Sequence, residues 1–468
     1  MSNGMPTKTQ HQMEKESSTL VSDGLCNNSE KEPHDFREEF LNTFDVYIEE
    51  MKGTGETFSF SNQGKRNFFL PSPFDTAQFV FGLSMKSLIQ YFEQDSGEKI
   101  PIGDSNKKAL FNKKGVSYRT AKKLSPWLRP LLSKGLQNIN RDSWGIVEKG
   151  SQGAYNTAAW GSLLAGFRTE FALSGVEVAM PEQEPQINFL LRRLEAEVEM
   201  VTDIRKQVGA GQVKEDDSIA LMKLMLPYWK RHTLVPEVQW INFIEKIELI
   251  ESGNKIVGTK PVTEFIISFI HIHLDFYFHL FASYEVGCVL TYREKKEELE
   301  DKPGLLYEAV TNYVANSNLE DYKWTCFGEL LEALRRAISK RHGELSQRQM
   351  AMLIPMGHSG SPSQESDYER HYKKLKSWRS GKETPRFEQL EKFINNIANH
   401  FRLGGDSFPV ALLLLMSLHI DNTVKHWSEE FQKTSELKDN EQAFEGLFNA
   451  IGRYKEYYHH HLSSQMRK

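Results

Sequence analysis

The most apolar long stretch of the chain, residues 263 to 290, restricts the fold more than any other segment. Its length is that of a helix that crosses a membrane. A membrane span would place several ionisable side chains in or near hydrocarbon, which is costly; they are His271, His273, Asp275, His279 and Glu285. The stretch is aromatic all round its helical period, as a central helix of a packed core is. We therefore predict a buried central helix in a mainly α-helical protein, and no membrane partner.

The same stretch contains a spacing that suits metal ligands. His271, Asp275 and His279 recur every four residues, so they would share one helical face and present two imidazoles and a carboxylate. The alternative interpretation is a buried Asp–His pair that satisfies its own hydrogen bonds. A metal-dependent enzyme centred on these three residues is kept as an alternative function, whereas the main prediction contains no metal and no cofactor.

Residues 99 to 141 concentrate positive charge in a chain whose formal net charge is −5. They include eleven Lys and Arg residues and a single acid, Asp104. Such a stretch attracts a phosphate backbone through counterion release and does not read its sequence. The alternative is a solvated face that pairs with acidic residues of the same chain or of a partner. The predicted phosphate contacts are Lys107, Lys108, Lys113, Lys114, Arg119, Lys122 and Lys123.

Residues 344 to 399 combine helix start and stop signals with positive charge. Ser346 is placed to cap the start of a short helix. Gly381 follows the last apolar position of a second helix, where a glycine takes the left-handed conformation without steric cost. Thr384 before Pro385 starts a third helix. Three short helices in sequence, the middle one rich in Arg, Lys and His, predict a helix-turn-helix.

The order of residues here resembles the Cro/C1-type, phage-repressor-like helix-turn-helix over about residues 324 to 400. The resemblance is carried by Leu-Ser-Gln followed by Ala, by an aliphatic residue three before an aromatic, and by Gly-Lys-x-x-Pro followed by Leu. It implies that Ala351 lets two helices approach closely, and that residues 367 to 380 form the helix that reads DNA. The core it implies consists of Leu345, Met350, Leu375, Trp378 and Leu390.

The resemblance also implies which residues contact DNA. Gln347, at the head of the first motif helix, would lie against a phosphate and brace the next helix. The other implied contacts follow along the chain: Arg370, His371, Lys373, Lys374, Ser377, Arg379 and Lys382. Two features depart from the family pattern. Arg379 stands where the family usually has an acid that makes an internal contact, and residues 355 to 366 lengthen the family turn with an inserted loop.

Chain length and the positions of Gly-, Pro- and charge-rich loop segments divide the 468 residues into five predicted regions. Residues 1–35 are polar and poor in aromatic residues, which predicts a disordered tail. Helical domains are predicted at 36–210 and 211–318, followed by the helix-turn-helix module at 319–400 and carboxyl-terminal helices at 401–468. Residues 57 to 70 alternate aromatic and polar side chains around Gly64, which is typical of a short hairpin. Three scattered cysteines and the absence of a secretory signal are typical of a reducing cytoplasm.

The chain contains no nucleophile elbow, His-Glu-x-x-His or kinase signature, so no catalytic residue is predicted and binding is favoured over catalysis. The sequence predicts a cytoplasmic DNA-binding protein of bacterial or phage type. It would be a transcriptional regulator or a protein of a mobile element or phage, with duplex DNA as its partner. The first alternative is a non-enzymatic interaction or effector protein whose helical module binds a protein. A second copy of the chain or another protein is a further expected partner.

Overall fold

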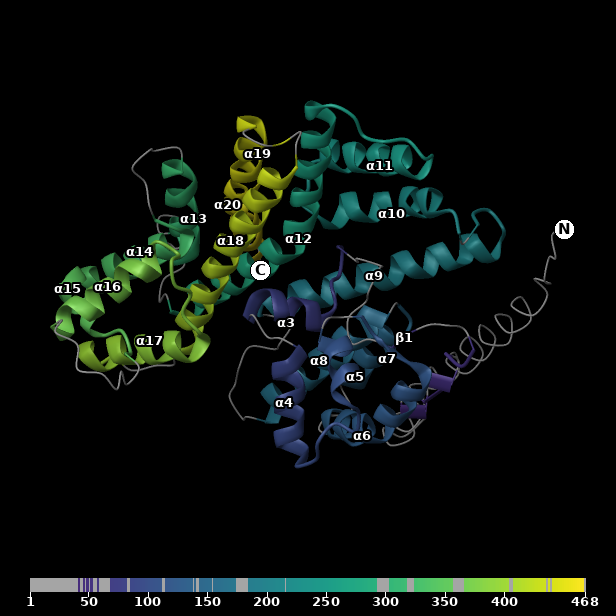
Figure 1. Ribbon diagram of the computed structural model, residues 1–468, viewed down its shortest axis with the longest axis horizontal. Coiled ribbons are helices and arrows are strands. Elements are labelled where there is room, and N and C mark those ends of the chain that lie inside the picture. The colour runs from purple at the N-terminus through teal and green to yellow at the C-terminus, as the bar shows by residue number, and fades with distance from the viewer. Residues whose placement is uncertain are drawn as a thin grey trace.

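The protein is mainly α-helical, as predicted, in the computed structural model shown in Figure 1. The structure describes residues 41–42, 45–46, 48–49, 51–53, 57–58, 68–81, 85–111, 114–137, 139, 143–153, 155–173, 184–214, 216–292, 303–317, 324–356, 366–403, 407–434, 437 and 440–466. The predicted tail at residues 1–35 lies outside the described residues.

The described elements are helices and two short strands. The amino-terminal and central elements are β1 Thr57–Phe58, α3 Pro73–Phe81, α4 Met85–Ser96, α5 Asp104–Phe111, β2 Val116–Ser117, α6 Tyr118–Gln137, α7 Trp144–Ser151, α8 Tyr155–Leu173, α9 Pro185–Gly209, α10 Ser218–His232, α11 Glu237–Glu251 and α12 Thr259–Tyr292. The later elements are α13 Leu305–Asn316, α14 Cys326–His342, α15 Gln347–Met352, α16 Asp367–Arg379, α17 Phe387–Phe401, α18 Phe408–Lys433, α19 Glu441–Gly452 and α20 Tyr454–Met466.

Helix α12 lies at the centre of the larger part of the molecule (Figure 1). It packs against α9 and α11 from the preceding chain and against α18, α19 and α20 from the following chain. Within the described residues, Thr259–Thr291 is the one helical segment long and apolar enough to cross a membrane, and 67% of its most apolar window is buried inside the protein. The predicted buried central helix is therefore confirmed.

The buried carboxylate of Glu285, on α12, holds the start of α13. It accepts hydrogen bonds from the backbone amides of Leu306 (2.6 Å) and Tyr307 (3.2 Å) and from the hydroxyl of Tyr454 (2.9 Å). The first amides of a helix have no partner within the helix, so a carboxylate placed there stabilises the helix start. Gly304 leaves room for this contact, because a Cβ there would lie 2.2 Å from the Oε1 atom of Glu285.

One continuous core joins α9, α12, α14 and α18 and contains Leu194, Phe278, Leu331 and Leu415. The predicted boundaries near residues 211, 319 and 401 therefore do not coincide with breaks in the core. Turn and charge signals mark loops, and a loop does not have to separate two cores. A distinct core lies earlier in the chain, within α4, α5, α6 and the two strands; we call this part the amino-terminal lobe.

The strands β1 and β2 join segments that are distant in the sequence. They pair antiparallel, with Thr57 opposite Ser117 and Phe58 opposite Val116. The hairpin predicted within residues 57 to 70 is therefore wrong for these two residues, and residues 59–67 lie outside the described part of the chain. Gly115 precedes β2 with a φ of +73°, and a Cβ there would lie 2.6 Å from the Oγ1 atom of Thr57. The pairing of β1 with β2 therefore needs a glycine at this position.

Candidate nucleic-acid interface

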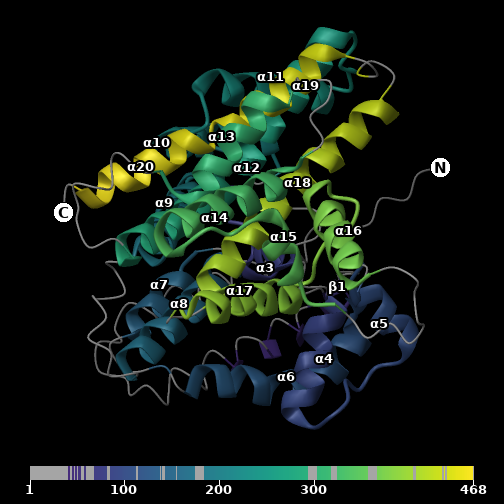
Figure 2. The same ribbon diagram turned by 90° about the vertical axis from the view of Figure 1, so that its left-hand side faces the viewer.

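Helices α14 to α17 form a module at one end of the molecule, on the left in Figure 1 and facing the viewer in Figure 2. Ala351 is fully buried where α15 packs against α16. The five residues predicted to form the core of the module are each exposed by 1% or less: Leu345, Met350, Leu375, Trp378 and Leu390. Their predicted burial is confirmed, although burial by itself does not identify a family.

Both α15 and α16 begin with a complete capping box. The Ser346 hydroxyl accepts from the backbone amide of Gln349 (3.2 Å), and the Gln349 side chain accepts from the Ser346 amide (2.8 Å). Ser366 and Glu369 make the same pair of bonds at the start of α16, at 3.2 and 3.1 Å. Gly381 has a φ of +66° just after α16 ends. Local sequence signals therefore fix both ends of α16.

Arg379 points into the protein, although it was expected to contact DNA. Its guanidinium lies 3.1 Å from the Glu332 carboxylate on α14 and 3.6 Å from the centre of the Trp324 ring, and the residue is 6% exposed. Burial by itself would raise the pKa of Glu332, but Arg335 and Arg379 outweigh that effect and hold this pKa below its ordinary value. Arg379 is therefore buried in an internal ion pair and is not exposed for contact with DNA.

The face of α16 that points away from the core carries three of the predicted contacts. Lys373 is exposed, and Arg370 and Ser377 are half-buried beside it. Residues spaced by three and four positions lie along one side of a helix. We call Arg370, Lys373 and Ser377 the α16 ridge. Within it, Arg370 also forms an ion pair with Asp367 in the first turn of the helix.

The other predicted contacts lie beside the ridge, and they differ in accessibility. Gln347 at the start of α15 and Lys382 after α16 are exposed. Lys374 forms an ion pair with Glu383. His371 is half-buried, and its Nδ1 atom lies 3.2 Å from the carbonyl oxygen of Ala351. His371 is therefore engaged between α15 and α16.

A row of cationic and aromatic side chains runs along one side of the ridge, and sequence reasoning missed it. The Arg348 guanidinium lies 4.5 Å from the centre of the Tyr368 ring, and the Tyr368 and Tyr372 rings stack with their centres 5.7 Å apart. The Nζ atom of Lys376 lies 5.0 Å from the centre of the Tyr372 ring. These are cation–π distances. We call these four residues the aromatic flank; the four-residue spacing of 368, 372 and 376 is the signal that predicts it.

The predicted phosphate contacts of the basic stretch lie in the amino-terminal lobe. Two of them pair with acids of the same chain: Lys107 lies 3.6 Å from Glu93 and Lys122 lies 2.6 Å from Glu49. Lys113 lies outside the described residues. The remaining four are exposed: Lys108, Lys114, Arg119 and Lys123. Pairing within the chain, the alternative interpretation, therefore accounts for part of the stretch and leaves these four side chains at the surface.

The α12 face predicted as an alternative metal site is occupied by internal hydrogen bonds. The Asp275 carboxylate accepts from Arg193 (3.0 Å) and from the hydroxyl of Tyr457 (3.0 Å), and the Nε2 atom of His279 lies 3.6 Å from it. Burial lowers the pKa of His271 to about 4, so this imidazole is neutral near pH 7. Among the described residues, no group of three His, Cys, Asp or Glu side chains could hold a metal ion. The described residues therefore do not form the alternative metal site of His271, Asp275 and His279, and Asp275 belongs to a buried ion pair.

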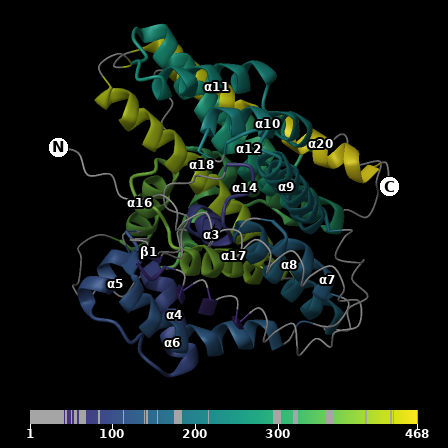
Figure 3. The ribbon, with the colours of Figure 1, turned by 90° about the vertical axis from the view of Figure 1, so that its right-hand side faces the viewer.

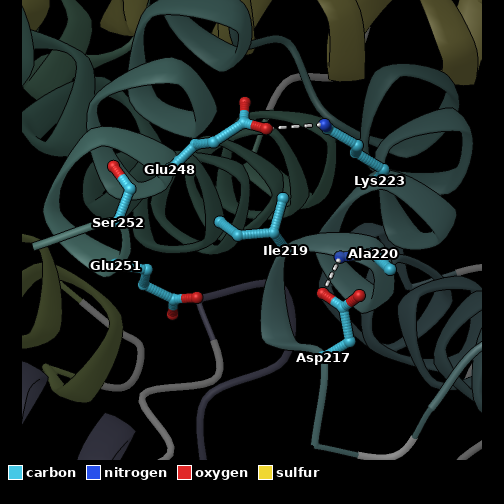
Figure 4. A pocket seen from close by; sticks show the side chains of 7 residues that line it. All are labelled: Asp217, Ile219, Ala220, Lys223, Glu248, Glu251 and Ser252. Carbon is cyan, nitrogen blue, oxygen red and sulfur yellow. Dashed lines mark hydrogen bonds and ion pairs between the residues drawn. The ribbon is translucent and has the colours of Figure 1, made fainter.

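A pocket of about 390 Å³ with both charged and apolar lining residues lies between the start of α10 and the end of α11 (Figure 4). Its charged side chains already have partners. Asp217 accepts from the amide of Ala220 (2.9 Å), Lys223 binds Glu248 (3.1 Å), and Glu251 accepts from the hydroxyl of Ser218 (2.5 Å). We therefore assign no ligand to this pocket.

Three features remain that can meet a polyanion: the α16 ridge, the aromatic flank and the exposed basic residues of the amino-terminal lobe. The ridge and the flank lie on the α14–α17 module, whereas the lobe occupies the bottom of the molecule (Figures 1 and 2). No protein-family model, no curated protein and no solved structure matches this chain.

Proposed function

We propose that the protein binds duplex DNA, with α15 and α16 acting as a helix-turn-helix and α16 lying in the major groove. The observation that carries the proposal is the polarity of α16. Leu375 and Trp378 fix its inner face in the core, while the α16 ridge lies on the opposite face, with Lys373 exposed and Arg370 and Ser377 half-buried. Basic and hydroxyl side chains are the groups that bond base edges, and the major groove has the width to admit a helix.

Rigid placement of α16 supports the proposal. The Trp378 ring packs edge-on against Phe327 of α14 and Phe393 of α17, with ring centres 6.4 and 5.9 Å apart. The buried pair of Arg379 with Glu332 joins the end of α16 to α14. A helix that is already ordered loses little conformational entropy on binding, so more of the interaction free energy appears as affinity.

The proposal divides the exposed side chains into two roles. The α16 ridge reads base edges, and the side chains beside it hold phosphates and set the register; these are Gln347, Arg348, Lys376 and Lys382. Asp367 and Glu369 in the first turn of α16 repel phosphate, so the middle of the helix, around Lys373, enters the groove. A DNA-binding surface that is confined to one module, in a chain whose formal net charge is −5, fits a transcriptional regulator or a protein of a mobile element or phage.

Selection of bound sequences from random duplex DNA tests the proposal. The wild-type protein should enrich a defined sequence, and a variant with Lys373→Ala and Ser377→Ala should lose the enrichment. Lys392→Ala is the matched control, because Lys392 is an exposed lysine on α17, away from the ridge. The absence of duplex binding at low salt, or the same enrichment in the ridge variant, would overturn the proposal.

A second candidate function is binding of a protein partner, and the aromatic flank favours it. Tyrosine and arginine are enriched among the residues that dominate protein interfaces. A second copy of the chain is the partner that can be tested directly. Light scattering on the purified protein should then show a dimer that Tyr372→Ala dissociates, whereas a monomer at micromolar concentration would remove this form of the second candidate.

A further inference from the structure

We propose that the amino-terminal lobe forms a second contact with the same duplex, on its phosphate backbone, outside the site read by α16. This inference rests on the proposed DNA binding and adds a surface to it. The contact is made by four exposed basic residues, which we call the lobe quartet: Lys108, Lys114, Arg119 and Lys123. It carries no sequence preference, because phosphates are the same at every base pair.

The fold of the lobe places the quartet on a fixed support. The lobe has its own core, which includes Ile100, Leu110 and Trp127. Both α5 and α6 pack against β2, so the basic residues of the two helices are held by one small scaffold. The amide of Lys114 donates to the carbonyl oxygen of Ala109 near the end of α5 (2.8 Å). The backbone of Lys114 is therefore held at the end of α5, beside Ala109, the residue that follows Lys108.

Helix α6 separates its apolar and basic residues onto opposite faces. Ala121, Leu124 and Leu128 are buried at a spacing of three and four residues. Arg119 and Lys123, four residues apart, are exposed on the other side. A helix whose inner face is held in a core presents the opposite face to solvent. The basic face of α6 is therefore available to a ligand.

Among the described residues, the acids of the lobe pair with basic residues outside the quartet. Glu49 accepts from Lys122 (2.6 Å) and from the hydroxyl of Tyr118 (2.7 Å), and Asp45 pairs with Arg129. The Lys122 contact, followed by that of Tyr118, holds the pKa of Glu49 below its ordinary value, so this acid is ionised near pH 7. Within the described residues, none of the quartet lies within ion-pair distance of an acid.

The position of the lobe relative to α16 supports a shared duplex. Figures 2 and 3 view the molecule from opposite ends, and both show α5 and α16 along the same edge. Figure 1 shows the two helices at different places along the length of the molecule. A long duplex that lies in contact with α16 can thus continue toward the lobe, whereas a duplex of one helical turn is occupied by α16 alone.

The salt dependence of binding measures the proposed contact. Each phosphate that a protein neutralises contributes about 0.9 to the slope of log K against log salt concentration. Replacing the whole lobe quartet with alanine should therefore reduce the magnitude of the slope by about 3 to 4 on a duplex of roughly 30 base pairs. On a duplex of roughly 12 base pairs, a little more than one helical turn, the slope should stay the same.

Fluorescence anisotropy with labelled duplexes of both lengths, over a range of salt concentrations, provides the test. The control is Lys107→Ala with Lys122→Ala, which removes lysines that already have carboxylate partners and should change the slope less. A gain-of-contact variant, Glu49→Gln, releases Lys122 and should increase the slope by about 1 on the long duplex. The quartet variant should keep the sequence selection of the wild-type protein.

The outcomes separate this inference from the proposed function. An unchanged slope in the quartet variant on the long duplex, together with loss of sequence selection in the ridge variant, would overturn the lobe contact alone. No duplex binding by the wild-type protein would overturn both. Circular dichroism checks whether the quartet variant keeps its helical content. If it does not, the test is the increase in slope expected from Glu49→Gln, and an unchanged slope in the Glu49→Gln variant would overturn the lobe contact.

Discussion

The buried ion pair between Glu332 and Arg379 should respond unequally to removal of its two partners. Glu332 has a second partner, because its carboxylate also accepts from Arg335 at 2.6 to 3.1 Å. Arg379 has no other ion-pair partner among the described residues, and its side chain is 7% exposed. Glu332→Gln therefore removes the carboxylate that contacts the buried guanidinium and leaves it with the longer-range attraction of Glu329, whereas Arg379→Met leaves an acid that is still paired.

The expected magnitudes follow from this asymmetry. Leaving a buried charge without its partner costs about 3 to 5 kcal/mol, which is the expected loss in the free energy of unfolding for Glu332→Gln. Arg379→Met removes one charged hydrogen bond and keeps apolar bulk, so its expected cost is about 2 kcal/mol. The double variant should cost less than the two single variants together, because neither charge is then left alone.

Urea unfolding of the three variants measures these differences, with Lys149 and Glu195 as a matched surface pair. Their side chains lie 2.6 Å apart and are 46% and 52% exposed, so separating them should cost less than about 1 kcal/mol. Equal losses for Glu332→Gln and Arg379→Met, or strictly additive losses in the double variant, would refute the reasoning.

Two further predictions concern the same module. A Cβ on Gly328 would lie 2.6 Å from the backbone oxygen of Arg379, so Gly328→Ala should push α14 away from α16 and lower the free energy of unfolding by about 1 to 3 kcal/mol, as measured by thermal unfolding. The control is Gly145→Ala, which has nothing near its added Cβ and should be neutral or stabilising. An equal loss of stability in both variants would contradict this prediction. Burial raises the pKa of Asp421 to about 7, against the opposing effect of the Phe327 and Cys326 amides. A carboxyl whose pKa is raised on folding contributes stability that is present below pH 4 and is lost as the pH rises through about 7. Between pH 5 and pH 8, the free energy of unfolding of Asp421→Asn should therefore fall less than that of the wild-type protein. Urea unfolding at several pH values measures this difference, and the same pH dependence in both proteins would contradict the raised pKa of Asp421.

Local signals in the sequence determined the elements and much of what is buried. The aromatic content of residues 263 to 290 predicted a buried helix, and α12 is one. Ser346 and Gly381 predicted a helix start and a helix end, and the capping bond and the φ of +66° are present. Leu375 and Trp378 are buried as expected. These features depend on side chains within a few residues of one another, so a single sequence contains the information that fixes them.

Only the tertiary structure decided which polar residues face solvent. The helix-turn-helix resemblance placed Arg379 among the DNA contacts, but its side chain is buried against Glu332, which lies on a different helix. Asp275 suited a metal site by spacing, yet Arg193 on α9 takes its carboxylate. Pairing between distant segments is set by how the whole chain packs and not by local spacing. The sequence alone therefore determined the helices and their apolar faces, whereas the accessible surface depended on which charges met across the core.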